Sequence, residues 1–289
     1  MDVDRRAEDR TLDQVIETLG LDPTHADRIG RDLGRARLGR SEGQLHLTLE
    51  SLEIDDDDRG GLRRREIDLV AAPNVVLTVH EGEIAALERF RGSLDGETRL
   101  GASTAADLVS ALVDQVIVGY FEIAEVIERE IDDLDQRALD ARRNDDVLDR
   151  IVALRQRVGF IRRTLAPHRE ALSILSLPET GIDEGIGRPW PGLVERLDSA
   201  TGMVEGLRDA LLGTFDIHMG RVSQRANDVM RTLTLLSAVL LPAVVLAGIM
   251  GMNFKLPFFE EPGNFWVVAG AMTIMAVSIL GAARWRRWL

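Results

Sequence analysis

The chain has 289 residues, with 48 acidic and 35 basic side chains, a net charge of −13 and no cysteine. This balance has the wrong sign for nucleic-acid binding, which needs basic patches against phosphate. The lack of cysteine excludes disulfides, thiolate catalysis and cysteine-ligated metals.

The first residues, MDVDRRAEDR, lack the apolar core of a signal peptide, so we expect this part of the chain to stay in the cytoplasm. Residues 11–37 predict two short helices. Apolar patterns then predict strands at residues 44–54, 66–72 and 74–80. A turn is expected at residues 55–61, which read DDDDRGG, and a helix at residues 81–94. The first hundred residues therefore predict a small α/β unit.

Two long helices are predicted next. Ser103 is a candidate cap for the first, because apolar residues follow it at helical spacing. A turn around residues 144–146 separates this helix from a second one that ends near Leu175. Prolines and glycines between residues 176 and 192 then interrupt the helical pattern.

The remaining pattern is helical without a break from Leu193 to Asn253. At about 1.5 Å per residue, this helix would be about 90 Å long. It cannot bury its apolar face alone. It therefore needs the preceding helix pair, other copies of the chain, or both.

Two uncharged runs near the C-terminus predict membrane spans. Residues 232–253 and 265–283 contain no charged side chain, and each run can cross about 30 Å of hydrocarbon. The alternative is that both runs form buried helices of a soluble core. Two such runs so close together make this alternative less favourable. Arginines flank the pair on both sides, whereas the connecting loop holds only Lys255. The positive-inside rule therefore places both termini in the cytoplasm and the loop outside.

The predicted fold class is an α/β cytoplasmic domain plus a long α-helical stalk and two C-terminal transmembrane helices, mainly α overall. In chain order we expect the α/β unit (1–102), an acidic antiparallel helix pair and linker (103–192), the stalk helix (193–231), the first transmembrane helix (232–253), an external loop (254–264), the second transmembrane helix (265–283) and a basic cytoplasmic tail (284–289).

The end of the first predicted span carries a family motif. Gly251, Met252 and Asn253 lie where this span would leave the membrane. Residues 227–254, NDVMRTLTLLSAVLLPAVVLAGIMGMNF, resemble the corresponding segment of the CorA family of divalent-cation channels, which are two-span proteins with a Gly-x-Asn motif. The chain departs from the family pattern at Met250, where Tyr is usual. Its loop reads Leu-Pro-Phe-Phe-Glu-Glu in place of the Met-Pro-Glu-Leu common in magnesium transporters.

The resemblance implies a homopentamer in the lipid bilayer of the cell (inner or plasma) membrane, with the first span of every copy lining a central pore. Five copies of Asn253 would form a ring of amides at the outer mouth. Such a ring can hydrogen-bond a hydrated magnesium ion without stripping its water. A helix C-cap is the alternative role for Gly251 and Asn253, since both residue types are favoured there.

By family position, a stripe of residues on the stalk and first span would face this pore. The stripe consists of Asp216, Asn227, Met230, Leu233, Ser237, Leu241, Val244 and Gly248, three to four residues apart after a longer first step. Asp216 and Asn227 would form polar rings. Met230, Leu233 and Leu241 would form apolar constrictions that can gate by dewetting. An ordinary helix-packing seam is the alternative.

Two groups of carboxylates belong to the candidate site. Glu260 and Glu261 in the outer loop can raise the cation concentration near the mouth, or they are simply solvated. The first long helix carries Glu122, Glu125, Glu128, Glu130, Asp132, Asp133 and Asp135. The resemblance implies that carboxylates between neighbouring cytoplasmic domains bind the transported ion and favour closure. A solvated helix face is the alternative.

We therefore expect a channel for hydrated divalent cations, in the first place magnesium, with cobalt or nickel as further substrates. Membrane potential would drive the ion inward, and cytoplasmic cation would gate the pore. The divalent cation is thus both substrate and regulator, without any cofactor or nucleic-acid partner. No nucleophile–base pair or phosphate loop indicates an enzyme. A zinc transporter of the ZntB-like branch and a non-conducting, membrane-tethered sensor or scaffold are the alternatives.

Overall fold

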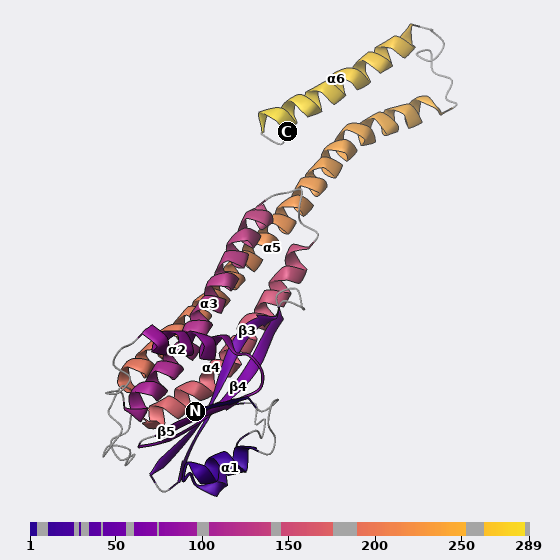
Figure 1. Cartoon of the computed structure of the whole chain (residues 1–289). Helices are drawn as coiled ribbons and strands as arrows, with labels where there is room; N and C mark the ends of the chain where they lie inside the picture. Colours follow the sequence, from indigo (N-terminus) through magenta and orange to yellow (C-terminus); the bar gives the residue numbers. More distant parts are fainter. Residues whose placement is uncertain are drawn as a thin grey trace. The chain divides into compact units, whose positions relative to one another are not determined.

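The computed structural model describes residues 1–4, 11–25, 29, 35–41, 43–55, 61–73, 75–96, 104–139, 146–175, 190–252 and 263–286. The chain divides into two compact units, Met1–Ile217 and His218–Leu289. Helix α5, Trp190–Met250, contributes to both units, and helix α6, Asn264–Trp285, belongs to the second (Figure 1).

The first unit contains a five-stranded sheet in the order β1-β5-β4-β3-β2. The strands are β1 (Asp2–Asp4), β2 (Arg37–Ser41), β3 (Gln44–Asp55), β4 (Gly61–Ala72) and β5 (Val75–His80). All neighbours are antiparallel except β1 and β5. The three predicted strands correspond to β3, β4 and β5. The sequence interpretation missed β1, which has only three residues, and β2, whose residues Arg-Leu-Gly-Arg-Ser lack an apolar pattern.

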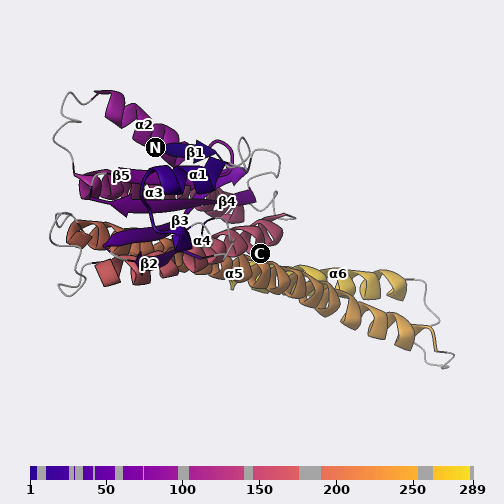
Figure 2. The same ribbon diagram turned by 60° about the horizontal axis from the view of Figure 1, so that its bottom comes forward.

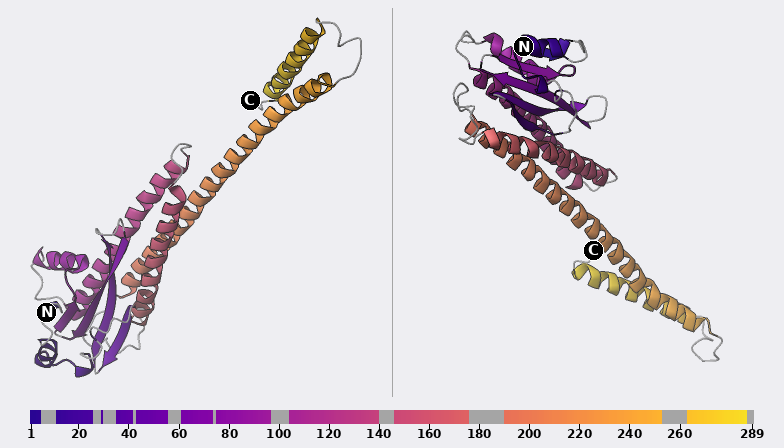
Figure 3. Two further views of the ribbon diagram at one scale, coloured as in Figure 1. Left: turned by 90° about the vertical axis from the view of Figure 1, so that its right-hand side faces the viewer. Right: turned by 90° about the horizontal axis from the view of Figure 1, so that it is seen from below.

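Alternating strand residues give the sheet two apolar faces. Leu47, Leu49 and Leu69 point to the larger core, together with residues of α2 (Ala85–Gly96), α3 (Ala105–Leu139) and α4 (Val147–Leu175). On the other face, Val70 and Leu77 pack with α1 (Thr11–Thr18). The sheet therefore lies between α1 and the long helices, with α4 running along β2 and β3 (Figures 2 and 3).

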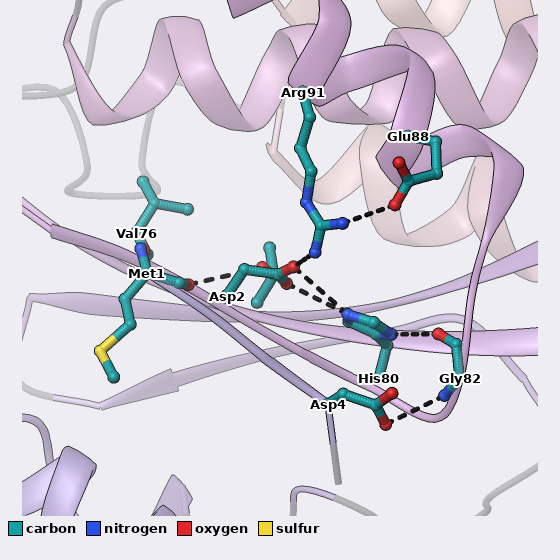
Figure 4. Close-up of polar contacts among 9 residues, drawn as sticks. Met1, Asp2, Asp4, Val76, His80, Gly82, Glu88 and Arg91 are labelled. Carbon is teal, nitrogen blue, oxygen red and sulfur yellow. Dashed lines mark hydrogen bonds and ion pairs between the residues drawn. The ribbon is translucent and has the colours of Figure 1, made fainter. Parts of the chain in front are cut away.

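Side chains hold the short edge strand β1 in place (Figure 4). Asp2 accepts hydrogen bonds from Thr78 and Arg91, and its carboxylate lies 3.3 Å from Nε2 of His80. The backbone N–H of Gly82 donates to Asp4 at 3.0 Å, in a turn where Gly82 has a φ of 72°. A strand of three residues can form only a few backbone hydrogen bonds with its neighbour. These side-chain contacts therefore help to attach β1 to β5 and to α2.

Two helical predictions need correction. The second short helix expected before residue 37 does not extend that far, because Arg37 begins β2; Pro23–His25 forms a single 3-10 turn, and residues 26–28 and 30–34 lie outside the described residues. Helix α5 begins at Trp190, so Pro191 and Gly192 belong to its first turn and not to the linker. Proline is tolerated there because the N–H groups of a first helical turn have no partner within the helix. Of the turn predicted at residues 55–61, Asp55 ends β3 and Gly61 begins β4, and residues 56–60 lie outside the described residues.

Helix α3 begins with a capping box. The Asp107 carboxylate accepts the Thr104 N–H at 2.8 Å, and the Asp107 N–H donates to the Thr104 hydroxyl at 3.2 Å. The Thr104 hydroxyl also donates to the Asp107 carboxylate at 2.8 Å, and the two hydrogen bonds from the Thr104 N–H and hydroxyl lower the pKa of Asp107 below its ordinary value. Ser103, the predicted cap, lies outside the described residues, and Thr104 carries the role. This reciprocal pair satisfies two N–H groups that the helix itself cannot satisfy.

Replacing Thr104 by Ala should lower the free energy of unfolding by about 1 kcal/mol, because the N–H of Asp107 loses its acceptor. Chemical denaturation of the full chain in detergent, followed by the fluorescence of buried Trp190, measures this loss. Thr104→Ser keeps the hydroxyl and should behave like the parent. Equal losses in both variants would contradict the cap.

The edge of β3 next to β2 is completed by two helices and not by a strand. Strand β2 pairs with β3 only as far as Thr48. At Glu50 the backbone N–H donates to Nε2 of His168 on α4 at 2.9 Å, and the carbonyl accepts from the Tyr120 hydroxyl of α3 at 2.7 Å. Both backbone groups of Glu50 are thereby satisfied, and we refer to these two bonds as the edge lock.

His168 is neutral in this position. Its ring is 2% exposed, and Nδ1 donates to the Thr164 carbonyl at 2.8 Å. Burial lowers the pKa of His168 to about 4 and raises the pKa of Tyr120 well above its ordinary range. Only a neutral imidazole can accept from Glu50 through Nε2 while donating through Nδ1.

Candidate pore helix and membrane segment

The C-terminal unit contains two helices with large exposed apolar surfaces. The uncharged parts of α5 and α6 are each long and apolar enough to cross a membrane, and at most 6% of either segment is buried. A core helix of a soluble protein would be mostly buried. These helices therefore need lipid or other copies of the chain around them.

The predicted pore stripe lies on one side of α5. All eight of its residues are exposed, among them Met230 (67%), Leu233 (61%) and Leu241 (68%). Apart from Pro242, the less exposed residues of the membrane segment lie two positions further along, at Leu235, Val239, Ala243, Leu246 and Met250. Two positions correspond to about 200° around a helix. The stripe thus points away from the side of α5 that the unit itself covers.

Helix α5 ends at Met250, three residues before the predicted end at Asn253. The next two N–H groups still bond back into the helix, from Gly251 to Ala247 at 2.9 Å and from Met252 to Ile249 at 3.2 Å. Among the described glycines, positive φ values occur at Gly20, Gly43 and Gly82, and not at Gly251. The left-handed cap that would by itself require glycine is therefore not formed at residue 251. Asn253, Glu260 and Glu261 lie outside the described residues.

The acidic run lies on α3, and several of its members already have arginine partners. Glu122 lies 3.2 Å from Arg89 of α2, and Glu130 lies 2.8 Å from Arg157 of α4. Asp133 pairs with Arg137 and lies 3.7 Å from Arg150. Glu125, Glu128 and Asp132 are exposed. The sequence interpretation missed these arginines, because a single sequence does not show which helix faces meet.

Within the described ranges, no group of three or more His, Asp or Glu side chains is arranged to hold a metal ion. The seven carboxylates are spread along about 20 Å of α3, at about 1.5 Å per residue. A cation site made of these residues would therefore need ligands from beyond the described part of one subunit.

Taken together, an α/β unit, a long helix pair and a two-helix apolar C-terminal unit define a two-span membrane protein with a large extramembrane domain. A profile of the CorA-like Mg2+ transporter protein family matches residues 1–282. The chain belongs to this family, and is thus a divalent-cation transporter of the membrane and not an enzyme.

Individual relatives agree with this assignment over most of their length. The cobalt/magnesium transport protein CorA of Thermotoga maritima is 26% identical over 281 residues, which cover 96% of this chain and 80% of that protein. The complete structure of the CorA magnesium transporter from Methanocaldococcus jannaschii superposes with a TM-score of 0.80 at 19% identity, covering 98% of this chain and 89% of that one. The full-length CmaX protein gives a TM-score of 0.74 at 21% identity, with 99% and 88% covered.

Proposed function

We propose that five copies of the chain form a channel that conducts hydrated magnesium into the cytoplasm, with cobalt and nickel as further substrates. The observation that carries this proposal is the exposed stripe of α5, which lies opposite the covered side of the helix and ends next to Gly251-Met252-Asn253. One two-span subunit cannot enclose a pore, so copies around an axis are needed to bring these stripes together.

In this arrangement each part of the stripe has a physical role. Five Asn253 amides select hydrated divalent ions at the outer mouth, and Glu260 and Glu261 raise the local cation concentration. Met230, Leu233 and Leu241 form dry constrictions below it, and Asn227 and Asp216 form polar rings on the cytoplasmic side. A neutral amide ring suits magnesium, which keeps several of its waters when bound.

The membrane potential supplies the driving force. One elementary charge gains about 2.3 kcal/mol per 100 mV, so a divalent ion gains about twice that amount. The arginines before the first span and after the second support an orientation with both termini in the cytoplasm.

Flux of metal ions into liposomes that contain the purified full chain tests the proposal. We expect magnesium uptake that rises with a negative internal potential and is reduced by competing cobalt and nickel. Preferred uptake of zinc would assign the chain to zinc transport. Absence of flux for every divalent ion, from protein that is pentameric by mass photometry, would favour a sensor or scaffold.

A further inference from the structure

The charges of the chain are divided unequally between its two units. Met1–Ile217 carries 45 acidic and 28 basic side chains, whereas His218–Leu289 carries three acidic and seven basic ones. Six of these seven are arginines, and we refer to them as the basic cluster. They are Arg221, Arg225, Arg231, Arg284, Arg286 and Arg287. The two segments that contain them, 218–231 and 284–289, hold a single acidic residue, Asp228.

Both halves of the basic cluster lie on the same side of the membrane. Arg231 directly precedes the uncharged run 232–253, and Arg284 directly follows the run 265–283. Two successive crossings return the chain to the side from which it came. The basic cluster therefore lies where the two spans leave the hydrocarbon, next to the lipid headgroups.

On α5, the basic cluster points away from the stripe proposed to line the pore. Arg221 and Arg225 are exposed, and Arg231 is half-buried. At about 100° per residue, Arg221 lies about 180° and Arg225 about 140° around the helix from Met230. In the proposed channel these two side chains therefore face outward. Arg225 lies only about 9 Å along the helix from Arg231, at the end of the span.

The end of α6 combines arginine with tryptophan. Arg284 and Arg286 are exposed, and neither forms an ion pair within the part of the chain that the structure describes. Trp285 between them is 87% exposed. An indole ring has an apolar body and a polar N–H, so it is favoured at the boundary between hydrocarbon and headgroups. This end of α6 is thus suited to a surface that is apolar on one side and anionic on the other.

We propose that the basic cluster binds the phosphate headgroups of anionic phospholipids in the cytoplasmic leaflet. A guanidinium group can bind a phosphate through two parallel hydrogen bonds. Arginines beside a span also attract anionic lipids through the surface potential of the membrane. Headgroups bound at Arg225 and Arg231 hold the cytoplasmic end of α5 at the membrane surface, next to Met230. The inference rests on the proposed orientation and pore-facing stripe, and it does not depend on conduction.

The preference of the full chain for an anionic lipid tests this assignment. Spin-labelled phosphatidylglycerol and phosphatidylcholine are compared by electron paramagnetic resonance in phosphatidylcholine bilayers that contain the chain. The parent should prefer phosphatidylglycerol, and the preference should weaken as salt is added. Arg225→Gln combined with Arg286→Gln removes one charge from each helix and should lower the preference roughly fivefold. The probe enters both leaflets, so the result does not depend on which way the chain is inserted.

Two further double variants serve as controls. Arg225→Lys with Arg286→Lys keeps the charges and should stay within about twofold of the parent. Arg155→Gln with Arg208→Gln removes two exposed arginines of the first unit and should leave the preference unchanged. Arg208 lies about 35 Å along α5 from Arg231, which is several Debye lengths.

Three results would overturn the lipid assignment. They are an unchanged preference in Arg225→Gln with Arg286→Gln, an equal loss in Arg155→Gln with Arg208→Gln, and displacement of the lipid by millimolar inorganic phosphate beyond the effect of chloride at equal ionic strength. The last result would assign the arginines to a soluble phosphate compound. Metal flux is measured separately on the same variants, so a channel without lipid preference leaves the proposed function standing.

Discussion

Asn253→Ala should lower magnesium flux roughly 10- to 100-fold while pentamers persist. The side-chain amide is proposed to hydrogen-bond the water shell of the ion, and such bonds to charged partners contribute about 1.5–3 kcal/mol. Alanine removes both donor and acceptor but leaves the preceding helix intact. Liposome flux measures the loss, and mass photometry reports the assembly.

Two further substitutions separate a selective ring from a helix cap. Asn253→Asp is nearly isosteric but places up to five carboxylates around one axis, which raises some of their pKa values by mutual repulsion. The remaining charge should hold divalent ions too tightly and slow their transit. Asn253→Gly would be tolerated if the residue only capped the helix. Near-normal flux through a correctly assembled Asn253→Gly channel would refute the ring.

Lowering the pH from 7 to 4 should remove about 3 kcal/mol of stability through His168 alone. Its pKa is about 4 in the folded state, below the ordinary value of 6.5. The unfolded chain therefore binds the proton more readily. The stabilisation is complete above pH 6.5 and is lost as the pH falls toward 4. Protonated His168 can no longer accept the N–H of Glu50, so the edge lock opens.

Denaturation of the full chain at several pH values, followed by Trp190 fluorescence, measures this slope. His168→Gln offers an amide oxygen as acceptor and does not titrate, so its pH slope between 4 and 6.5 should be shallower. Tyr120→Phe is the matched control. It removes the hydrogen bond to the Glu50 carbonyl, lowers stability by about 1–2 kcal/mol and keeps the parental slope. Identical slopes in His168→Gln and the parent would assign the effect to other groups.

Long periodic elements could be predicted from the sequence. The alternation in residues 44–54 identified β3, and the uncharged runs identified the apolar parts of α5 and α6. Strands β1 and β2 could not be predicted, since their sheet partners and not their own residues make them strands. The cap at Thr104 was missed by one position, because Ser103 and Thr104 are adjacent and serine is the slightly better cap residue.

The residues of the candidate site likewise include some that could be predicted from the sequence and some that could not. The stripe proposed to line the pore follows from helical spacing, and all its members belong to one helix. The edge lock joins residues that are 118 positions apart, and the ion pair of Glu130 with Arg157 joins two helices. A single sequence contains the members of such contacts but no sign of their proximity. Nothing in the sequence therefore identifies His168 as a partner of Glu50.

The edge lock also has a consequence for synthesis on the ribosome. Glu50 leaves the ribosome long before His168, and at roughly 5–20 residues per second the 118 intervening positions take about 6–24 s. During that interval the edge of β3 beyond Thr48 has unsatisfied backbone groups, which attract foreign strands. The nascent chain therefore passes through a period in which this edge is open to pairing with foreign strands.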